Sequence, residues 1–139
     1  MHFDYQIEGG DFSTAGTISS NVKKFLKQLN VEGSIIKRTV VALYEAEVNV
    51  VAHAYRGKVE VDYFEDKIQI RIIDEGPGIS DIEKAMQAGF STASPEVREM
   101  GFGAGMGLPN MKNNTDELIV NSEVGVGTTV MMVNYFNNQ

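Results

Sequence analysis

The sequence predicts an α+β fold in which helices are layered on a mixed sheet. Two helical patterns dominate the first half of the chain, and segments that alternate apolar and β-branched residues with polar ones follow in pairs. No internal repeat or low-complexity segment interrupts this order. The 139 residues, 42% of them apolar, are enough for one core, so we expect a single domain over residues 1–139.

The first half of the chain is expected to supply one strand and two helices. Residues 3–7 alternate apolar and polar side chains, as a half-buried strand does. The Ser-Ser-Asn cluster at residues 19–21 is suited to cap a helix, because the apolar residues after it recur at helical spacing. The longest element is a helix expected from about residue 34 to residue 55, with a wide apolar stripe.

The second half is expected to be rich in strands, because its apolar residues alternate and turn residues separate the runs. Residues 89–105 are only loosely patterned, and we expect them to act as a lid. The expected elements are a hairpin of strands at 58–63 and 67–73, a short helix near 81–87, a helix at about 106–114, and strands at about 117–122 and 128–136.

Charge and composition exclude several classes of protein. A formal net charge of -7 disfavours a nucleic-acid surface, which needs clustered Lys and Arg. Without cysteine the chain forms no disulfide and no thiolate zinc site. No apolar run approaches the roughly 20 residues that cross a bilayer. We therefore expect a soluble cytoplasmic protein without a nucleic-acid or membrane partner.

The first candidate site lies on the long helix, where Glu45, Asn49 and His53 are four residues apart and share a face. A carboxylate can orient or deprotonate a nucleophile, and an amide oxygen one turn away can ligate Mg²⁺. The alternative is an ordinary solvated helix face. We assign no chemical role to His53, and we expect Glu47, which points elsewhere, to be solvated surface.

The second candidate site follows the strand at 67–73, which runs directly into Asp74, Gly76, Gly78 and Ile79. A carboxylate at a strand end can accept a hydrogen bond from an exocyclic amine such as that of adenine. Nearby glycines would let a flat base approach the backbone. Asp74 is our candidate for base recognition, and the alternative is an ordinary turn.

The third candidate is a glycine ladder at Gly101, Gly103, Gly105 and Gly107, after which a helical pattern begins. Glycines let backbone amides turn toward anionic oxygens, and a helix N-terminus adds partial positive charge, so a polyphosphate would suit this loop. It is not a Walker loop, because the Lys-Ser or Lys-Thr pair is missing. The alternative is a flexible hinge.

These three segments, in this order, resemble the GHKL or Bergerat-fold ATP-binding superfamily, which includes gyrase, MutL and the histidine kinases. The resemblance covers residues 35–133. It is closest to small bacterial serine/threonine kinases that act as anti-sigma factors or as switch kinases of stress signalling. It implies a two-layer sandwich with helices packed on one face of a mixed, mainly antiparallel sheet.

The resemblance also implies roles for individual residues. Glu45 matches the catalytic carboxylate of the superfamily and Asn49 its Mg²⁺ ligand. Lys112 is a weaker phosphate candidate, and Arg98 resembles a lid arginine that reaches phosphates or a partner, with solvated surface as the alternative. The nucleotide-binding residues implied are Asn49, Asp74, Gly76, Gly78, Ile79, Arg98, Gly103, Ala104, Gly105, Met106, Gly107, Leu108 and Thr128.

The function implied is an ATP-dependent and Mg²⁺-dependent serine/threonine kinase that phosphorylates a STAS-domain protein in bacterial transcriptional or stress signalling. A nucleotide-gated binding module that sequesters a sigma factor or activates an enzyme, with little catalysis, is the alternative. A detached histidine-kinase catalytic domain fits less well. Homodimerisation is common in this subgroup, and the strand at 3–7 could supply an interface or end within its own sheet.

Overall fold

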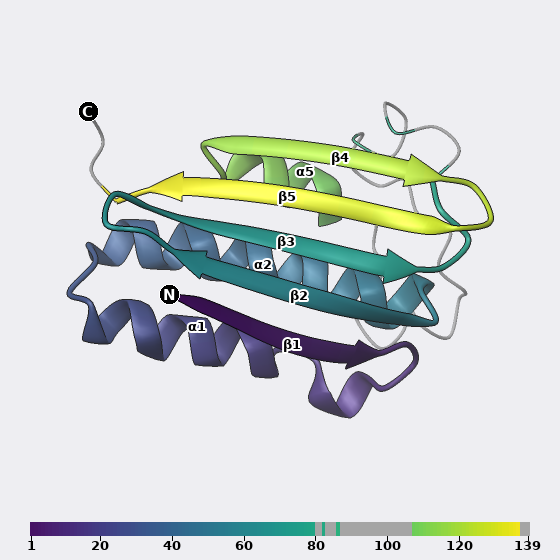
Figure 1. Cartoon of the computed structure of the whole chain (residues 1–139), viewed down its shortest axis with the longest axis horizontal. Coiled ribbons are helices and arrows are strands. Elements are labelled where there is room, and N and C mark those ends of the chain that lie inside the picture. Colours follow the sequence, from purple (N-terminus) through teal and green to yellow (C-terminus); the bar gives the residue numbers. More distant parts are fainter. Residues whose placement is uncertain (80–81, 83–85, 87–106, 137–139) are drawn as a thin grey trace.

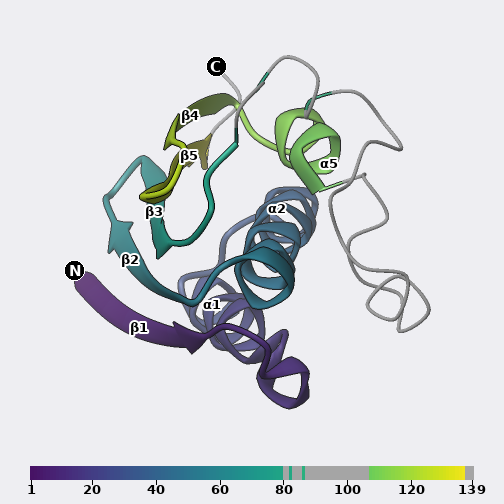
Figure 2. The same cartoon turned by 90° about the vertical axis from the view of Figure 1, so that its right-hand side faces the viewer.

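A computed structural model of the chain describes residues 1–79, 82, 86 and 107–136. Its helices lie together on one face of a single sheet, as two views of the chain show (Figures 1 and 2). The strands are β1 (His2–Glu8), β2 (Arg56–Tyr63), β3 (Lys67–Glu75), β4 (Glu117–Glu123) and β5 (Gly127–Tyr135). The helices are α1 (Thr17–Gln28), α2 (Gly33–His53) and α5 (Gly107–Asn113), with a 3-10 turn, η1, at Phe12–Thr14.

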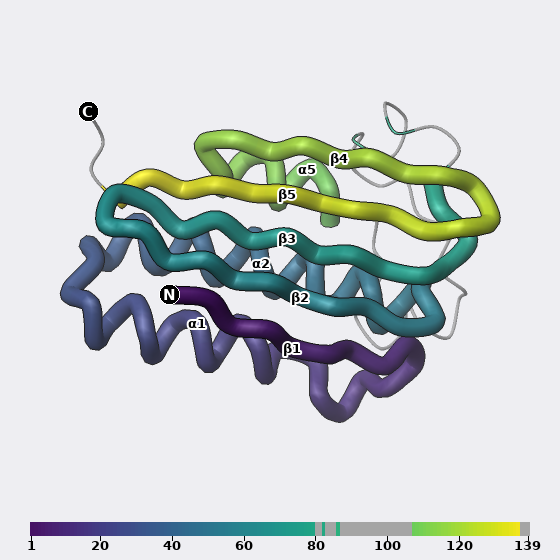
Figure 3. The backbone as a smooth tube through the Cα atoms, viewed as in Figure 1, coloured from purple at the N-terminus to yellow at the C-terminus, as the bar shows by residue number. Residues whose placement is uncertain are grey.

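The strands are ordered β1-β2-β3-β5-β4, and each neighbouring pair is antiparallel, so the described strands contain no parallel pair. Figure 3 follows the backbone from β1 at one edge of the sheet to β4 at the other. The predicted α+β fold is confirmed, and the predicted strands and helices recur with small shifts at their ends. The short helix expected near 81–87 lies mostly outside the described residues.

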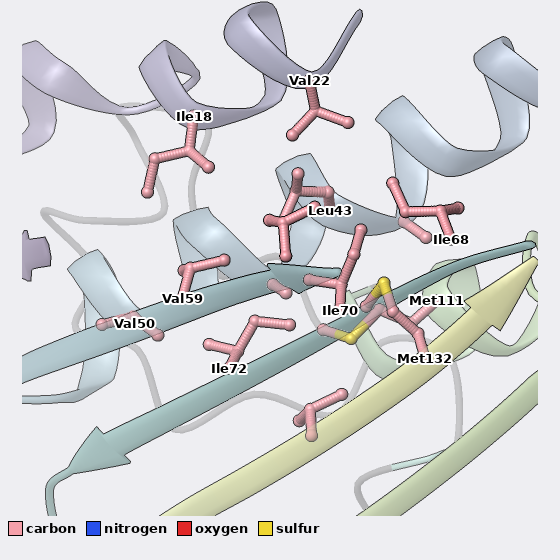
Figure 4. Packing of buried hydrophobic residues seen from close by; sticks show 14 of the residues in the cluster. Ile18, Val22, Leu43, Val50, Val59, Ile68, Ile70, Ile72, Met111 and Met132 are labelled. Atoms are coloured by element: carbon pink, nitrogen blue, oxygen red, sulfur yellow. The ribbon is translucent and has the colours of Figure 1, made fainter. Parts of the chain in front are cut away.

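The core lies between the sheet and the helices, with α2 at its centre (Figure 4). Strands β2 and β3 alternate buried and less buried residues, so one side of each faces the helices. Leu43 of α2 is fully buried, as are Val61 of β2 and Ile70 of β3. Burying each side chain of this size contributes roughly 1.5–3 kcal/mol to stability. This packing fixes α2 as a rigid support for any polar residue on its remaining faces.

The start of α1 differs from the prediction. Residues 19–21 do not cap the helix, because α1 begins at Thr17 and its N-cap position is Gly16, in the left-handed region with φ +96°. Because Gly16 has no side chain, it cannot accept a hydrogen bond from the first turn as a capping residue does. The backbone N–H groups there are nevertheless satisfied, because a residue from α2 reaches them.

That residue is Glu47, and our expectation that it is solvated surface is wrong. Its side chain is buried, with 2% of its surface exposed. Oε2 accepts hydrogen bonds from the backbone N–H groups of Gly16 at 2.7 Å and Ile18 at 3.2 Å, and Oε1 accepts one from Ser19 at 3.1 Å. A carboxylate at a helix N-terminus is favoured both by these donors and by the helix dipole. Glu47 therefore joins α1 to α2.

We expect Glu47→Gln to lower the free energy of unfolding by about 2–4 kcal/mol, because a neutral amide has one acceptor oxygen for three buried donors. Urea unfolding followed by circular dichroism measures this. Glu65→Gln, an exposed position in the β2–β3 turn, is the matched control and should change stability little. A Glu47 variant no less stable than this control would contradict the role assigned to the carboxylate.

A second polar contact holds the first residue of β1. The ring of His2 lies between two carboxylates, with Nδ1 2.6 Å from Oδ1 of Asp62 and Nε2 2.7 Å from Oδ1 of Asp4. Asp62 is the register partner of His2 on β2. The hydrogen bond with Asp62, followed by that with Asp4, raises the pKa of His2 above its ordinary value of 6.5. Protonated His2 therefore stabilises the folded state.

Because the pKa is raised on folding, this contribution is complete below the unfolded value and is lost as the pH rises through the folded value. We expect the stability difference between the native chain and His2→Gln to be largest near pH ~5.5 and to shrink above pH ~7. Urea midpoints across this range measure it. His53 is present in both proteins, so its own titration cancels. A difference that does not change with pH would contradict the bridge.

Candidate functional site

The last turns of α2 and the first turn of α5 bring together two of the predicted site residues. Glu45 and Asn49 are both half-buried on α2. A Cβ built on Gly107, the first residue of α5, would lie 3.9 Å from Oδ1 of Asn49 and 3.9 Å from Oε2 of Glu45. Two oxygens from α2 therefore face the start of the helix that follows the glycine ladder, next to a residue without a side chain.

Asn110 completes this part of the site, and the sequence analysis missed it. Its Nδ2 donates a hydrogen bond of 3.2 Å to Oε1 of Glu45. Asn110 lies three residues after Gly107, so both fall on one face of α5. The three-residue spacing from Gly107 could have indicated that Asn110 shares its face, but nothing in the local sequence indicates that this face meets Glu45.

A second group lies where the end of β3 is beside the start of β5. Oδ1 of Asp74, which is half-buried, accepts a hydrogen bond of 3.0 Å from the backbone N–H of Thr128. Burial raises the pKa of the Asp74 carboxyl, and the hydrogen bond from Thr128 opposes this rise. The two residues, predicted from distant segments, are thus in direct contact.

Ser122, which the sequence analysis also missed, connects this group to Ile79. The backbone N–H of Ile79 donates to Ser122 Oγ at 2.7 Å, and Ser122 Oγ donates to the carbonyl oxygen of Gly127 at 3.1 Å. The hydroxyls of Ser122 and Thr128 are 2.8 Å apart. Because Ser122 has one proton, which Gly127 accepts, Thr128 is the donor in this last bond. Ser122 pairs with Thr128 in the β4–β5 register, a relation visible only in the folded sheet.

Glycines allow the backbone segments at this end of the sheet to touch. A Cβ on Gly127, where φ is +156°, would collide with the carbonyl oxygen of Asp74. A Cβ on Gly78, where φ is +76°, would collide with the carbonyl oxygen of Glu123. A Cβ on Gly76 would lie 3.0 Å from Cα of Ala54, just after α2. The contact of Gly78 within the chain therefore requires glycine, and that of Gly76 favours it, whether or not a base approaches them.

Some of the remaining predicted residues lie within the described part of the chain, and the others lie outside it. Leu108 is described and packs its side chain in the core, while Lys112 is exposed. Burial lowers the pKa of His53, the third residue of the predicted helical face. Arg98, Gly103, Ala104, Gly105 and Met106 lie outside the described residues, as do Gly101 and the expected lid at 89–105.

Comparison with known proteins identifies the class to which the chain belongs. Residues 11–134 match the family described as the histidine kinase-like ATPase domain, and the chain belongs to this family. The predicted membership of the GHKL superfamily is therefore confirmed. Membership of an ATPase family implies that the chain binds a nucleotide. Within the described residues, no helix is long and apolar enough to cross a membrane.

Several curated relatives are similar over most of their length. The chain is 39% identical to an anti-sigma F factor of Thermoanaerobacter sp. (strain X514), covering 99% of this chain and 94% of that protein. It is 32% identical to the serine/threonine-protein kinase RsbT of Bacillus subtilis (strain 168), covering 90% and 89%. The solved structure of the RsbU and RsbW domains of Rv1364c from Mycobacterium tuberculosis shares the fold. There the TM-score is 0.64 at 14% identity, covering 96% of this chain and 31% of that one.

We expect Gly127→Ala to lower the free energy of unfolding by roughly 2 kcal/mol or more, because the new methyl group meets the Asp74 backbone at a strained φ. It should also weaken ATP binding, because the Asp74–Thr128 contact must open. Urea unfolding and calorimetric titration with ATP measure the two effects. Gly33→Ala, where a Cβ meets nothing within 4 Å, is the control. Equal stabilities of the two variants would contradict the close approach.

Proposed function

We propose that this protein is an ATP-dependent serine/threonine kinase of the anti-sigma factor or switch-kinase type, and that it phosphorylates a STAS-domain partner. The observation that carries the proposal is the convergence of Glu45 and Asn49 on Gly107. A carboxylate that can act as a general base, next to an amide oxygen that can ligate a metal ion, is suited to phosphoryl transfer. A module that only binds nucleotide has no need of a general base. The similarity to an anti-sigma F factor and to RsbT supports the same class.

In this proposal Asp74 recognises adenine. The Thr128 N–H uses Oδ1 of Asp74, so we assign the other carboxylate oxygen to the exocyclic amine of the base. Gly76, Gly78, Ile79 and the Thr128 hydroxyl would surround the base. Gly107 and the backbone of Leu108 would face the phosphates, as would Arg98, Gly103, Ala104, Gly105 and Met106.

The residues present fit a bound Mg²⁺. Oδ1 of Asn49 and Oε2 of Glu45 both approach Gly107, and oxygen donors of this kind are those that Mg²⁺ prefers. We assign Asn49 as the ligand. When bound, the ion would offset negative charge on the phosphates.

Glu45 is then the residue that acts on the acceptor. Its carboxylate lies one turn from Asn49 on a helix held by the core, so its position is fixed relative to the ligand. We assign it to orient or deprotonate a serine or threonine hydroxyl of the partner. The partner would belong to the sigma and anti-anti-sigma system, as the names of the relatives suggest. A sigma factor is a further candidate partner, as is a second copy of the chain.

A nucleotide-gated binding module remains the second candidate, supported by the name of the anti-sigma F factor relative. In that case ATP would set the affinity for a sigma factor, and transfer would be negligible. The discriminating measurement is transfer of label from γ-labelled ATP with Mg²⁺ onto STAS proteins of the same organism. Nucleotide-dependent capture of a sigma factor without such label would favour the binding module.

We expect Glu45→Ala to bind ATP with an affinity within about threefold of the native chain and to lose at least about 100-fold in transfer rate. We expect Asp74→Asn to weaken ATP binding tenfold or more, because a charged acceptor becomes an amide. Calorimetric titration and the label-transfer assay separate the two effects.

Matched controls for these variants are Glu65→Gln and Asp66→Asn, both exposed in the β2–β3 turn. Each should leave binding and transfer at the native level. Equal loss of ATP affinity in Glu45→Ala and Asp74→Asn would overturn the separate roles assigned to these carboxylates.

A further inference from the structure

We propose that Asn110 is a positioning residue for Glu45, holding one oxygen of its carboxylate so that the other faces the acceptor hydroxyl. This inference rests on the proposed kinase function and adds a residue to it. Asn110 donates from Nδ2 to Oε1 of Glu45 over 3.2 Å.

The geometry divides the two oxygens of Glu45 between two tasks. Oε1 accepts the hydrogen bond from the Asn110 amide, whereas Oε2 lies beside Gly107 together with Oδ1 of Asn49. A glutamate side chain has three rotatable bonds, and fixing it in one conformation costs rotamer entropy. A donor on α5 offsets this cost in the folded protein, before the acceptor arrives. The arrangement corresponds to the third group that orients a base in nucleophilic sites.

Asn110 is itself held in place. It lies on α5, which packs against α2, and its backbone oxygen accepts a hydrogen bond of 2.8 Å from Nδ2 of Asn114. Met111, the next residue, is fully buried in the core. The amide of Asn110 therefore projects from a fixed helix. Because α5 begins at Gly107, the same short helix carries the glycine that faces Asn49 and the asparagine that orients Glu45.

Asn110→Ala tests this assignment. We expect kcat for label transfer to fall about tenfold to a hundredfold with the KM for the acceptor and the Kd for ATP nearly unchanged, because only the orientation of Glu45 is lost. In the Glu45→Ala background the same substitution should have no further effect on the residual rate, because the carboxylate it positions is absent. Asn113→Ala, an exposed asparagine on α5, is the control and should retain the native rate.

ADP formation is measured in the same reactions, so that a failure of the positioning role can be distinguished from a failure of the kinase assignment. Suppose that the native chain labels no acceptor but forms ADP, and that the rate of ADP formation falls in both Glu45→Ala and Asn110→Ala. The kinase function is then overturned, and the positioning role stands with water as the acceptor. If transfer is native in Asn110→Ala, the positioning role alone is overturned. Additive losses in the double variant, or a large change in ATP affinity, would also overturn it. A native chain that binds ATP but forms neither product overturns both.

Discussion

The burial of α2 is the constraint on which the rest of the structure depends. The helix contacts the sheet on one side, α1 on another and α5 on a third, so few of its positions face water. Glu45 and Glu47 are two residues apart and therefore point to different sides of the helix. Glu47 turns toward α1 and satisfies its first turn, and Glu45 turns toward α5 and the site. The same helix thus uses one carboxylate for folding and leaves the other for chemistry.

The glycines at the edge of the sheet show a similar division. Gly127 and Gly78 allow backbone segments from β3, β4 and β5 to approach more closely than any side chain would permit. That approach brings the N–H of Thr128 to Asp74 and the N–H of Ile79 to Ser122. Gly107 instead leaves space in front of Glu45 and Asn49. Glycine therefore serves two different physical purposes in one site, namely backbone contact and open volume.

Most of the fold, and the placing of Glu45 and Asn49 on one helical face of the candidate site, could be predicted from the sequence, because both rest on local periodicity. Alternation indicated the strands, and the four-residue spacing of Glu45 and Asn49 placed them on one face. The role of Glu47 was predicted wrongly because its three donors lie 28 to 31 residues away on another helix. Asn110 and Ser122 were missed for the same reason, since each acts through a partner that only helix packing or strand register brings near.

The two carboxylates of the candidate site, Asp74 and Glu45, are held by different parts of the fold. Asp74 lies at the end of β3, where its carboxylate accepts a hydrogen bond from the backbone N–H of Thr128 on β5. Glu45 is held between α2 and α5, where its contact is an amide side chain. The two groups share no hydrogen-bonding residue within the described parts of the chain. Movement of α5 relative to α2 would therefore change the orientation of Glu45 without disturbing Asp74. Because Gly107 and Leu108 of α5 are assigned to the phosphates, such a movement would change the phosphate contacts and transfer together and leave the recognition of the base at Asp74 unchanged.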